Sequence, residues 1–537
     1  MEVPITFAFW IIAAMPIVII LLLMLKYRWG VSEAGAVAVL ITAASAMLVF
    51  KADIFLIASE SAKGIWNSFF VLLIVWPAIL IYEVTAEARA FQVIQLGMDA
   101  YTPNELLKIL AFGWVFASFF QGITGFGVPV AVCAPLLVGM GVVPVWAVVV
   151  PLLGHAWANT FGTLSVAWIA LIDQTGLSGV SIEQTAFWAA LFLWIFNFLG
   201  GVTLCWFYGG RAGVRKGLPA VVVISLIQGG GQMLISRFNQ TVAAFIPTSF
   251  ALATVFLFGR SKFYGKKWRI EKSPIMANRA EAPIGDGESL GLKLNQAFMP
   301  YYVLAIITIL VLMVPEINRF LKELKVGLPF EGTETGYGVV NAASAAYSAF
   351  SPFVHSGTLL FTAALIGYCF FRYKKRIKAG GTLTILLRSV EKTVPSMLAV
   401  SELLIMSKIM SGTGQTLILA SGVALVMGDF YALCAPAVGV LGAFITSSNM
   451  SSNILFAEFQ QITASITGMP GEPLLGAQTA GGAIGNTVAP GNVILGTTTT
   501  GIVGSEGTVL KKIFPIALLS AAVCGIILWL HLAIFTN

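Results

Sequence analysis

Long, nearly continuous apolar runs are the feature that most constrains this chain. Two of them, Phe7 to Leu25 and Ile513 to Phe535, are each long enough to cross a bilayer, which takes about 20 apolar residues as a helix. Of the 537 residues, 58% are hydrophobic and only 10% are charged, against about 25% charged in soluble domains. A soluble fold could not cover that much apolar surface. The sequence therefore predicts an all-α polytopic membrane protein and excludes a soluble enzyme, a disordered regulator and a nucleic-acid binder.

The size of the chain bounds the number of membrane crossings. At about 20 residues per span it accommodates roughly 12–14 transmembrane helices or half-helices. Its five cysteines lie in apolar runs without a CxxC pair, so neither structural disulfides nor a metal site is expected. The net charge of +7 is explained by basic loops, which stay on the cytoplasmic side of a membrane. We expect a multi-pass protein of the plasma (inner) membrane.

A long polar stretch, residues 260–297, divides the chain into two apolar parts. It is interpreted as a cytoplasmic linker between a first transmembrane half, 1–259, and a second, 298–537. In the second half, residues 316–337 are expected to form an amphipathic segment outside the membrane. Asp173, at a predicted helix boundary of the first half, is expected to contact water.

Each half contains two polar interruptions of otherwise apolar sequence. The earlier interruptions are 121–129 and 446–453, and the later ones are 155–163 and 485–492. Irregular backbone at membrane depth persists only where protein or a water-filled cavity satisfies its polar groups. Paired interruptions in corresponding places point to the binding site of a secondary transporter.

The earlier interruptions predict re-entrant hairpins near 106–140 and near 431–467. Their tips would offer helix N-termini to an anion, and loop carbonyls and hydroxyls to Na⁺. Helix packing through small residues is the alternative for the first hairpin, and an ordinary loop outside the membrane is the alternative for the second. The second is the sharper signal, because seven of the eight residues 446–453 are polar.

The candidate substrate- or ion-binding residues are the polar and glycine positions of the four interruptions: Gln121, Gly122, Thr124, Gly125, Gly127, His155, Asn159, Thr160, Thr163, Ser447, Ser448, Asn449, Ser451, Ser452, Asn453, Gly485, Asn486 and Thr487. Among them, His155 could relay a proton or be a hydrogen-bonded core histidine. Ionisable residues inside apolar runs are functional candidates by default, which adds Glu83, Glu402 and Lys408 as gating or coupling groups. Lys408 could instead extend to the membrane interface.

Three segments carry a resemblance to a known family. They are Gly122-x-x-Gly125-Phe126-Gly127-x-Pro129-Val130, then Ser451-Ser452-Asn453-x-Leu455-Phe456-Ala457, and Gly481-Gly482 with Val503-Gly504-x-Glu506. On these residues the chain resembles the lactate permeases, which carry L-lactate and glycolate across bacterial inner membranes. The resemblance is spread over most of the length. It implies an inverted repeat with two re-entrant hairpins, and a transport domain that moves against a scaffold.

The chain also departs from that family. Gln121 stands where typical members have Glu, Asn449 where they have Asp, Asn486 where they have Lys, and His155 where they have Asn. An amide cannot titrate, so proton coupling at the first three positions would be lost. We therefore interpret the chain as a divergent member that uses Na⁺ in place of H⁺.

The sequence thus predicts an ion-coupled secondary carrier of a small organic anion, such as a lactate- or glycolate-like monocarboxylate, with elevator-type alternating access. The alternatives are a cation/proton antiporter of the same superfamily, or a carrier of another organic anion such as a sulfonate or a dicarboxylate. An enzyme is not expected, and neither is a cofactor apart from a coupling ion, Na⁺ or H⁺. The other expected partner is the lipid bilayer, and the oligomeric state stays open, with a homodimer as one alternative.

Overall fold

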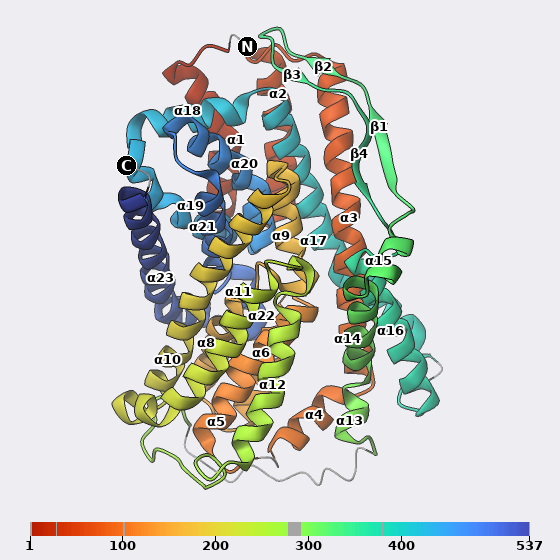
Figure 1. The fold of residues 1–537 in the computed structure, drawn as a ribbon, viewed down its shortest axis with the longest axis vertical. Helices are drawn as coiled ribbons and strands as arrows, with labels where there is room; N and C mark the ends of the chain where they lie inside the picture. The colour runs from red at the N-terminus through yellow and green to blue at the C-terminus, as the bar shows by residue number, and fades with distance from the viewer. Residues whose placement is uncertain are drawn as a thin grey trace.

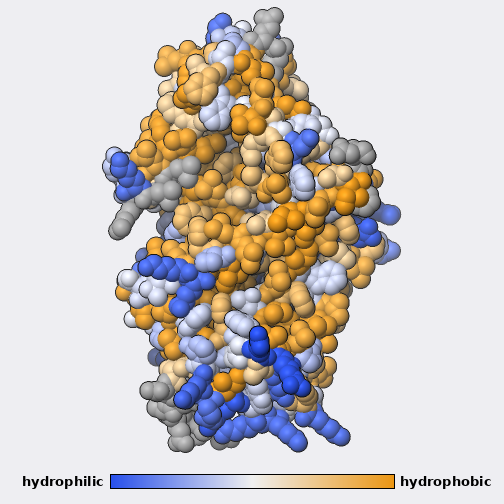
Figure 2. Space-filling model, turned by 90° about the vertical axis from the view of Figure 1, so that its left-hand side faces the viewer, coloured by the Kyte–Doolittle hydropathy of each residue, from blue (hydrophilic) through white to orange (hydrophobic). Residues whose placement is uncertain are grey.

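The computed structural model describes residues 3–27, 29–99, 102–125, 127–277, 291–378 and 380–535, and it is almost entirely helical (Figure 1). Within these residues, nine helices are long and apolar enough to cross a membrane, or ten if one bent pair counts as a single span. Figure 2 shows the broad apolar surface that such helices present, with hydrophilic side chains gathered at the lower end. The prediction of an all-α polytopic membrane protein is confirmed. Part of the predicted linker, 278–290, lies outside the described residues, as does Phe126.

One group of helices is built on the long pair α3 and α17, at the right of Figure 1. We call it the wall. Its members are α1 (Phe7–Leu25), α2 (Val31–Leu48), α3 (Ile54–Glu87), α14 (Met299–Met313), α16 (Ser356–Tyr373) and α17 (Gly381–Gly412). α2 and α16 contact the long pair, α14 joins the group through α16, and α1, to the left of the pair in Figure 1, joins it through α2. The short helices α4 (Ala90–Asp99) and α13 (Leu294–Ala297) contact each other below it, and α18 (Gln415–Met427) packs between α1 and α20.

The remaining helices form a second group, which we call the hairpin bundle. They are α5 (Glu105–Leu110), α6 (Ala117–Ile123), α7 (Val128–Gly139), α8 (Pro144–Ala156), α9 (Gly162–Thr175), α10 (Val180–Ser225), α11 (Gly231–Ile235), α12 (Phe245–Arg260), α19 (Tyr431–Thr446), α20 (Asn449–Thr467), α21 (Gly471–Gly485), α22 (Pro490–Thr499) and α23 (Glu506–Phe535). The π-helical turns Ala111–Phe116 and Leu226–Gly230 lead into α6 and α11, and α10 is kinked at Gly209 and Gly210.

The predicted interruptions are real breaks in the helices. α6 and α7 pack against each other across residues 124–127, where Gly125 and Gly127 adopt positive φ angles of 58° and 79°. A Cβ at Gly125 would lie 2.0 Å from Thr163 Oγ1, so only glycine fits this turn. α19 and α20 meet at Ser447 and Ser448 in the same way.

The two halves interlock in the hairpin bundle. The second helix of the first hairpin, α7, packs on α22, which follows the break after α21. The second helix of the second hairpin, α20, packs on α9, which follows the break after α8. In Figure 1, α5 and α6 lie in the lower part of the molecule, and α19 and α20 in the upper part. Each hairpin therefore rests against a broken helix of the other half.

The predicted amphipathic segment 316–337 consists of a short helix and short strands. After the short helix α15 (Pro315–Leu321), the chain forms β1 (Val326–Phe330), β2 (Thr333–Glu334), β3 (Val340–Asn341) and β4 (Ser344–Phe350). β1 pairs antiparallel with β4, and β2 with β3. The strands run along α3 at the upper right of Figure 1. Aromatic contacts hold them there, with ring centroids of Phe70 and Phe350 4.6 Å apart.

Candidate functional site

A cavity of about 740 Å³ lies between the wall and the hairpin bundle. Residues of both hairpin tips and both broken helices line it on one side, and residues of α2, α3 and α17 line it on the other. Its volume is in the range of small-molecule sites. Ten of the predicted site residues line it: Gln121, Gly127, His155, Asn159, Thr163, Ser447, Ser448, Asn449, Ser451 and Asn486.

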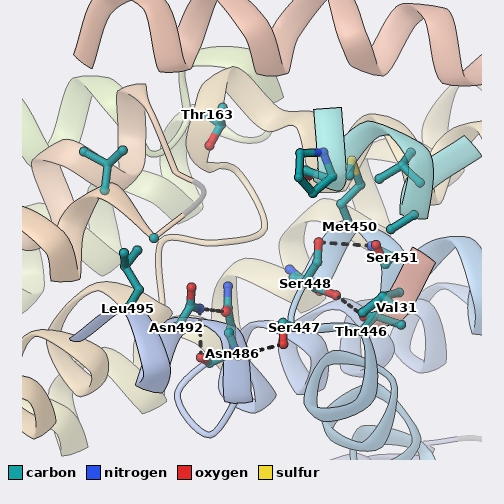
Figure 3. A pocket seen from close by; sticks show the side chains of 18 of the residues that line it. Val31, Thr163, Thr446, Ser447, Ser448, Met450, Ser451, Asn486, Asn492 and Leu495 are labelled. Carbon is teal, nitrogen blue, oxygen red and sulfur yellow. Dashed lines mark hydrogen bonds between the residues drawn. The ribbon is translucent and has the colours of Figure 1, made fainter. Parts of the chain in front are cut away.

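Side chains of the second half form one polar edge of this cavity (Figure 3). Ser448 is the N-cap of α20, and its hydroxyl accepts a hydrogen bond from the Ser451 backbone N–H at 3.3 Å. The Ser447 hydroxyl accepts a hydrogen bond from the Gly491 N–H at 3.0 Å, which ties the hairpin tip to the start of α22. Asn492 donates a hydrogen bond to the side chain of Asn486. These bonds fix hydroxyl and amide groups at the cavity surface.

The first half contributes an amide pair and a histidine. Gln121 Nε2 donates a hydrogen bond to Asn159 Oδ1 at 2.7 Å, which joins the first hairpin to the first broken helix. His155 Nδ1 lies 2.6 Å from the carbonyl oxygen of Pro151, one turn earlier in α8. This carbonyl can only accept, so Nδ1 carries a proton, and Nε2 is an acceptor whenever the ring is neutral.

The chain that follows His155 is strained. Three consecutive residues that are not glycine, Thr163, Leu164 and Ser165, have positive φ angles of 50°, 48° and 69°. Such conformations cost free energy and persist only where the surroundings impose them, which is a frequent property of functional sites. Here the hydroxyl of Ser165 donates a hydrogen bond to the Gln240 carbonyl, and Thr163 lines the cavity.

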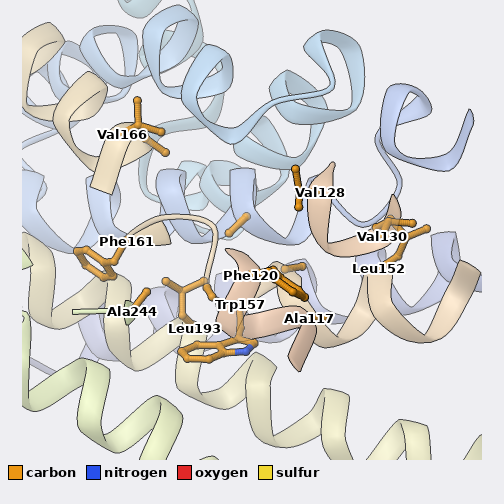
Figure 4. Close-up of a cluster of buried hydrophobic side chains, with 14 of the residues drawn as sticks. Ala117, Phe120, Val128, Val130, Leu152, Trp157, Phe161, Val166, Leu193 and Ala244 are labelled. Carbon is orange, nitrogen blue, oxygen red and sulfur yellow. The ribbon is translucent and has the colours of Figure 1, made fainter. Parts of the chain in front are cut away.

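An apolar cluster lies behind the polar surface and positions it (Figure 4). Phe120, Trp157 and Phe161 are fully buried at the first hairpin and the first break. The indole of Trp157 also donates a hydrogen bond to the Ser118 hydroxyl at 2.8 Å, and this hydroxyl donates to the Gly154 carbonyl at 2.9 Å. The break after α8 is therefore held between packed aromatic rings.

The other eight predicted residues do not line the cavity. Gly122 packs against α12 and Gly485 against α19, while Thr124 and Thr487 bond to carbonyls of their own helix ends. Gly125 packs against Thr163 and Gln121 of its own half. The last three lie in a buried polar layer where the two halves meet: Thr160, Ser452 and Asn453.

Two buried amide oxygens in this layer lack a hydrogen-bond partner among the described residues. Asn449 Nδ2 donates to the Thr160 hydroxyl at 3.2 Å, and Asn453 Nδ2 donates to the Thr479 hydroxyl at 2.9 Å. Thr160 in turn donates to the Thr479 carbonyl at 3.1 Å. Within the described part of the chain, neither Asn449 Oδ1 nor Asn453 Oδ1 accepts a hydrogen bond, although both are buried.

Two charged residues of the wall, among those described, also line the cavity, and the sequence reasoning missed both. Lys392 on α17 and Glu33 on α2 lie at its surface. The Lys392 ammonium forms an ion pair with Glu83 on α3 and lies 4.9 Å from the ring centroid of Tyr82. The one sequence signal for Lys392 is its position in the charged first third of an otherwise apolar run.

The remaining predicted gating residues lie elsewhere in the wall. Glu402 contacts Gly35 of α2, and its Oε2 atom has no hydrogen-bond partner among the described residues. Lys408 lies on α17 near the strands. It interacts electrostatically with Asp173 and Glu458 beneath β4 and lies 6.0 Å from the ring centroid of Tyr347.

Asp173 is half-buried rather than a solvated helix end. Its carboxylate accepts hydrogen bonds from Asn67 Nδ2 at 2.5 Å and from the Ser348 hydroxyl at 2.9 Å.

Comparison with known proteins identifies the family. The family model described as L-lactate permease matches residues 10–535. The chain is 27% identical to an L-lactate permease of Halalkalibacterium halodurans, over 93% of this chain and 92% of that protein. It is also 27% identical to the glycolate permease GlcA of Escherichia coli K12, over 98% and 96% of the two chains. Among solved structures, it resembles the YdaH transporter of Alcanivorax borkumensis with a TM-score of 0.42 and 12% identity, over 88% and 87% of the two chains.

The predicted resemblance is therefore confirmed, and with it the expectation of a transporter that resides in the membrane and is not an enzyme. The match extends from the first helix to the last, so it includes both hairpins and both broken helices. This chain belongs to the L-lactate permease family.

Proposed function

We propose that this protein is an ion-coupled secondary carrier of a small monocarboxylate of the lactate or glycolate type. The observation that carries the proposal is the cavity of about 740 Å³ at which both hairpin tips and both broken helices meet. Three helix N-termini, those of α7, α20 and α22, lie at its surface. Their positive dipole ends favour an anion. Named lactate and glycolate permeases are similar over nearly the whole chain, which supports the same substrate class.

For the coupling ion we propose Na⁺. The unpartnered oxygens belong to the side-chain amides of Asn449 and Asn453, whose nitrogens bond to the hydroxyls of Thr160 and Thr479. Thr160 in turn bonds to the Thr479 carbonyl. Neutral oxygen donors from side chains and unwound backbone are the ligands that transporters offer to Na⁺. These residues of both halves would hold the ion, and its charge would offset that of the substrate anion. Proton coupling is the alternative, for which His155, Glu83 and Glu402 are the titratable groups.

For alternating access we propose that the hairpin bundle moves against the wall. The cavity lies along the boundary between the two groups of helices, and the site residues of the bundle are joined to one another by hydrogen bonds. A bundle held together in this way can carry the site as a unit. The basic segments 211–216 and 260–272 lie at the end of the molecule that the positive-inside rule assigns to the cytoplasm.

Tracer uptake of L-lactate and glycolate into proteoliposomes tests these proposals, with a Na⁺ gradient or a pH gradient imposed in parallel. Uptake driven by Na⁺ and insensitive to pH is the expected result. Uptake driven only by the pH gradient would contradict Na⁺ coupling and leave the substrate proposal intact. No uptake of either acid by folded protein would contradict the substrate proposal, and a panel of sulfonates and dicarboxylates would then be tested. An Asn453→Leu variant should lose the Na⁺ dependence, whereas Thr487→Val, outside the layer, should keep it.

A further inference from the structure

The cavity has one strongly basic side chain, and its position is informative. Among the described residues that line the cavity, Lys392 is the one lysine or arginine. The groups opposite it on the hairpin bundle are hydroxyls, amides, a histidine and helix N-termini. An anion that leaves water for such a cavity needs a paired cation, because an unpaired buried charge is strongly unfavourable.

Lys392 is only partly engaged. Its ammonium has three N–H donors, and among the described residues its one carboxylate contact is with Glu83. Glu83 has 4% of its side chain exposed, whereas Lys392 has 51% exposed and faces the cavity. The carboxylate is thus sequestered between helices while the ammonium remains open to a second anion.

A neighbouring ion pair shows how the same two helices form an ordinary surface contact. One turn along, Arg388 of α17 contacts Glu87 of α3 at 3.3 Å, with 55% and 28% of the side chains exposed. Neither Arg388 nor Glu87 lines the cavity. The two pairs therefore differ in access to the cavity rather than in chemistry.

We propose that Lys392 is the counter-cation of the transported carboxylate, and that Glu83 is a resident carboxylate that keeps Lys392 paired and oriented when the cavity is empty. This inference rests on the proposed function. Lys392 can pair with one carboxylate of a ligand, and Glu33, which also lines the cavity, would repel a second one, so the site selects a monocarboxylate over a dicarboxylate. The uncharged amide of the same acid lacks the group that Lys392 binds.

The location of Lys392 also implies that the substrate is bound with different affinity in the two conformations of the transport cycle. Lys392 belongs to the wall, whereas the hairpin tips belong to the bundle. When the bundle moves, the substrate leaves Lys392 and this lysine returns to Glu83 alone. The anion is therefore bound more tightly in the conformation described here than in the opposite one.

Calorimetric titration of L-lactate, glycolate and lactamide into the full-length protein in detergent tests the inference. For Lys392→Gln we expect the affinity for L-lactate to fall about tenfold or more, as for the loss of a partner from a desolvated charge pair. The discrimination of L-lactate from lactamide should disappear with it. Lys392→Arg should keep most of the affinity, and Arg388→Gln should stay within about twofold of the wild type.

A charge swap distinguishes ligand binding from a structural ion pair. Glu83→Lys combined with Lys392→Glu retains a pair between α3 and α17, so the melting temperature should recover while L-lactate binding stays lost. Recovery of binding in the swapped protein, or wild-type affinity in Lys392→Gln, would overturn the inference. If Lys392→Gln does not fold, the L-lactate affinities of the swapped protein and of Lys392→Arg test the inference. Failure of the wild type to bind either acid would contradict the proposed function instead, since the inference concerns only the difference between variants.

Discussion

Two groups of charged residues lie along the same boundary between the wall and the hairpin bundle, and they differ in their access to the cavity. The Glu83–Lys392 pair lies at the open cavity. The other group, which we call the outer cluster, consists of Glu60, Lys63, Asp173, Lys408 and Glu458. It lies beneath β1 and β4, where Lys63 is within 5.8 Å of the Phe330 ring centroid and 5.6 Å of the Tyr347 ring centroid.

The outer cluster also joins the wall to the bundle. Asn67 on α3 donates to Asp173 on α9 at 2.5 Å, and Ser411 on α17 donates to Glu458 on α20 at 2.5 Å. Both bonds cross the boundary along which we propose that the bundle moves. The comparison teaches that similar charges act differently at the two places. At the cavity they are available to a ligand, and in the outer cluster they hold the two groups of helices together.

The largest effect should come from breaking the buried pair of the outer cluster. Lys63 and Glu60 are 2.6 Å apart, with 7% and 4% of their side chains exposed. Glu60→Gln leaves the Lys63 charge without its partner and should lower the free energy of unfolding by about 3–5 kcal/mol. Detergent titration of the purified protein measures this value. Replacing both residues by leucine is the matched control and should recover most of the loss, because no unpaired charge then remains. An unchanged value for Glu60→Gln would contradict the buried pairing.

Chemical labelling should separate the two regions by access. Ser396 lines the cavity and Ser407 is buried by the bundle, although both lie on α17 about 16 Å apart. In a cysteine-free background, Ser396→Cys should react with a membrane-impermeant maleimide more than about tenfold faster than Ser407→Cys, because protection of a buried site follows its rare opening. Labelling rates in inverted and right-side-out vesicles measure this difference. Equal rates would mean that the outer cluster is as open as the cavity.

Removing the Glu83 carboxylate should affect stability much less than removing the Glu60 carboxylate of the outer cluster. Glu83→Gln frees Lys392, which is half-exposed and can be solvated, so stability should fall by only about 1 kcal/mol or less. The affinity for L-lactate should rise by up to about fivefold, because the anion no longer competes with Glu83. Titration calorimetry measures the affinity, and the wild-type protein with added lactamide is the control. A fall in affinity would show that Glu83 orients Lys392 more than it competes for it.

The smallest effect should come from the exposed pair. Arg388→Gln removes a contact with Glu87 that is 3.3 Å long and open to solvent. The free energy of unfolding should change by about 0–1 kcal/mol, and less at high salt. The same detergent titration at two salt concentrations measures this difference. A loss of unfolding free energy as large as that for Glu60→Gln would mean that the exposed and the buried ion pair contribute equally to stability.

The sequence predicts the hairpin tips well because their chemistry is local. Glycines that need positive φ at Gly125 and Gly127, and the serine and asparagine run that caps α20, are visible as polar interruptions of apolar sequence. The lining of the cavity by Gln121, Asn159 and Ser448 follows from those interruptions.

Residues whose role depends on distant partners are harder to predict. Lys392 is one of several charged residues in its helix, and its partner Glu83 lies on a helix more than 300 positions earlier in the sequence. Which face of α17 meets the cavity depends on how α2, α3 and α17 pack, and periodicity alone does not specify that packing. The strands β1 and β4 were missed because their exposure pattern lacks the alternation that marks a strand with one buried face.

The interlocked hairpins have a consequence for how the protein is made. The hydroxyl of Thr160, in the break after α8, bonds to Asn449 and to Thr479. A ribosome delivers the first broken helix to the membrane long before it synthesises these two partners. The polar groups of the first half therefore lack their partners in the bilayer during synthesis. The first half reaches its final structure only after the second half has inserted. A chain released early would leave these polar groups unsatisfied in lipid, which gives membrane quality control a chemical signal of incomplete synthesis.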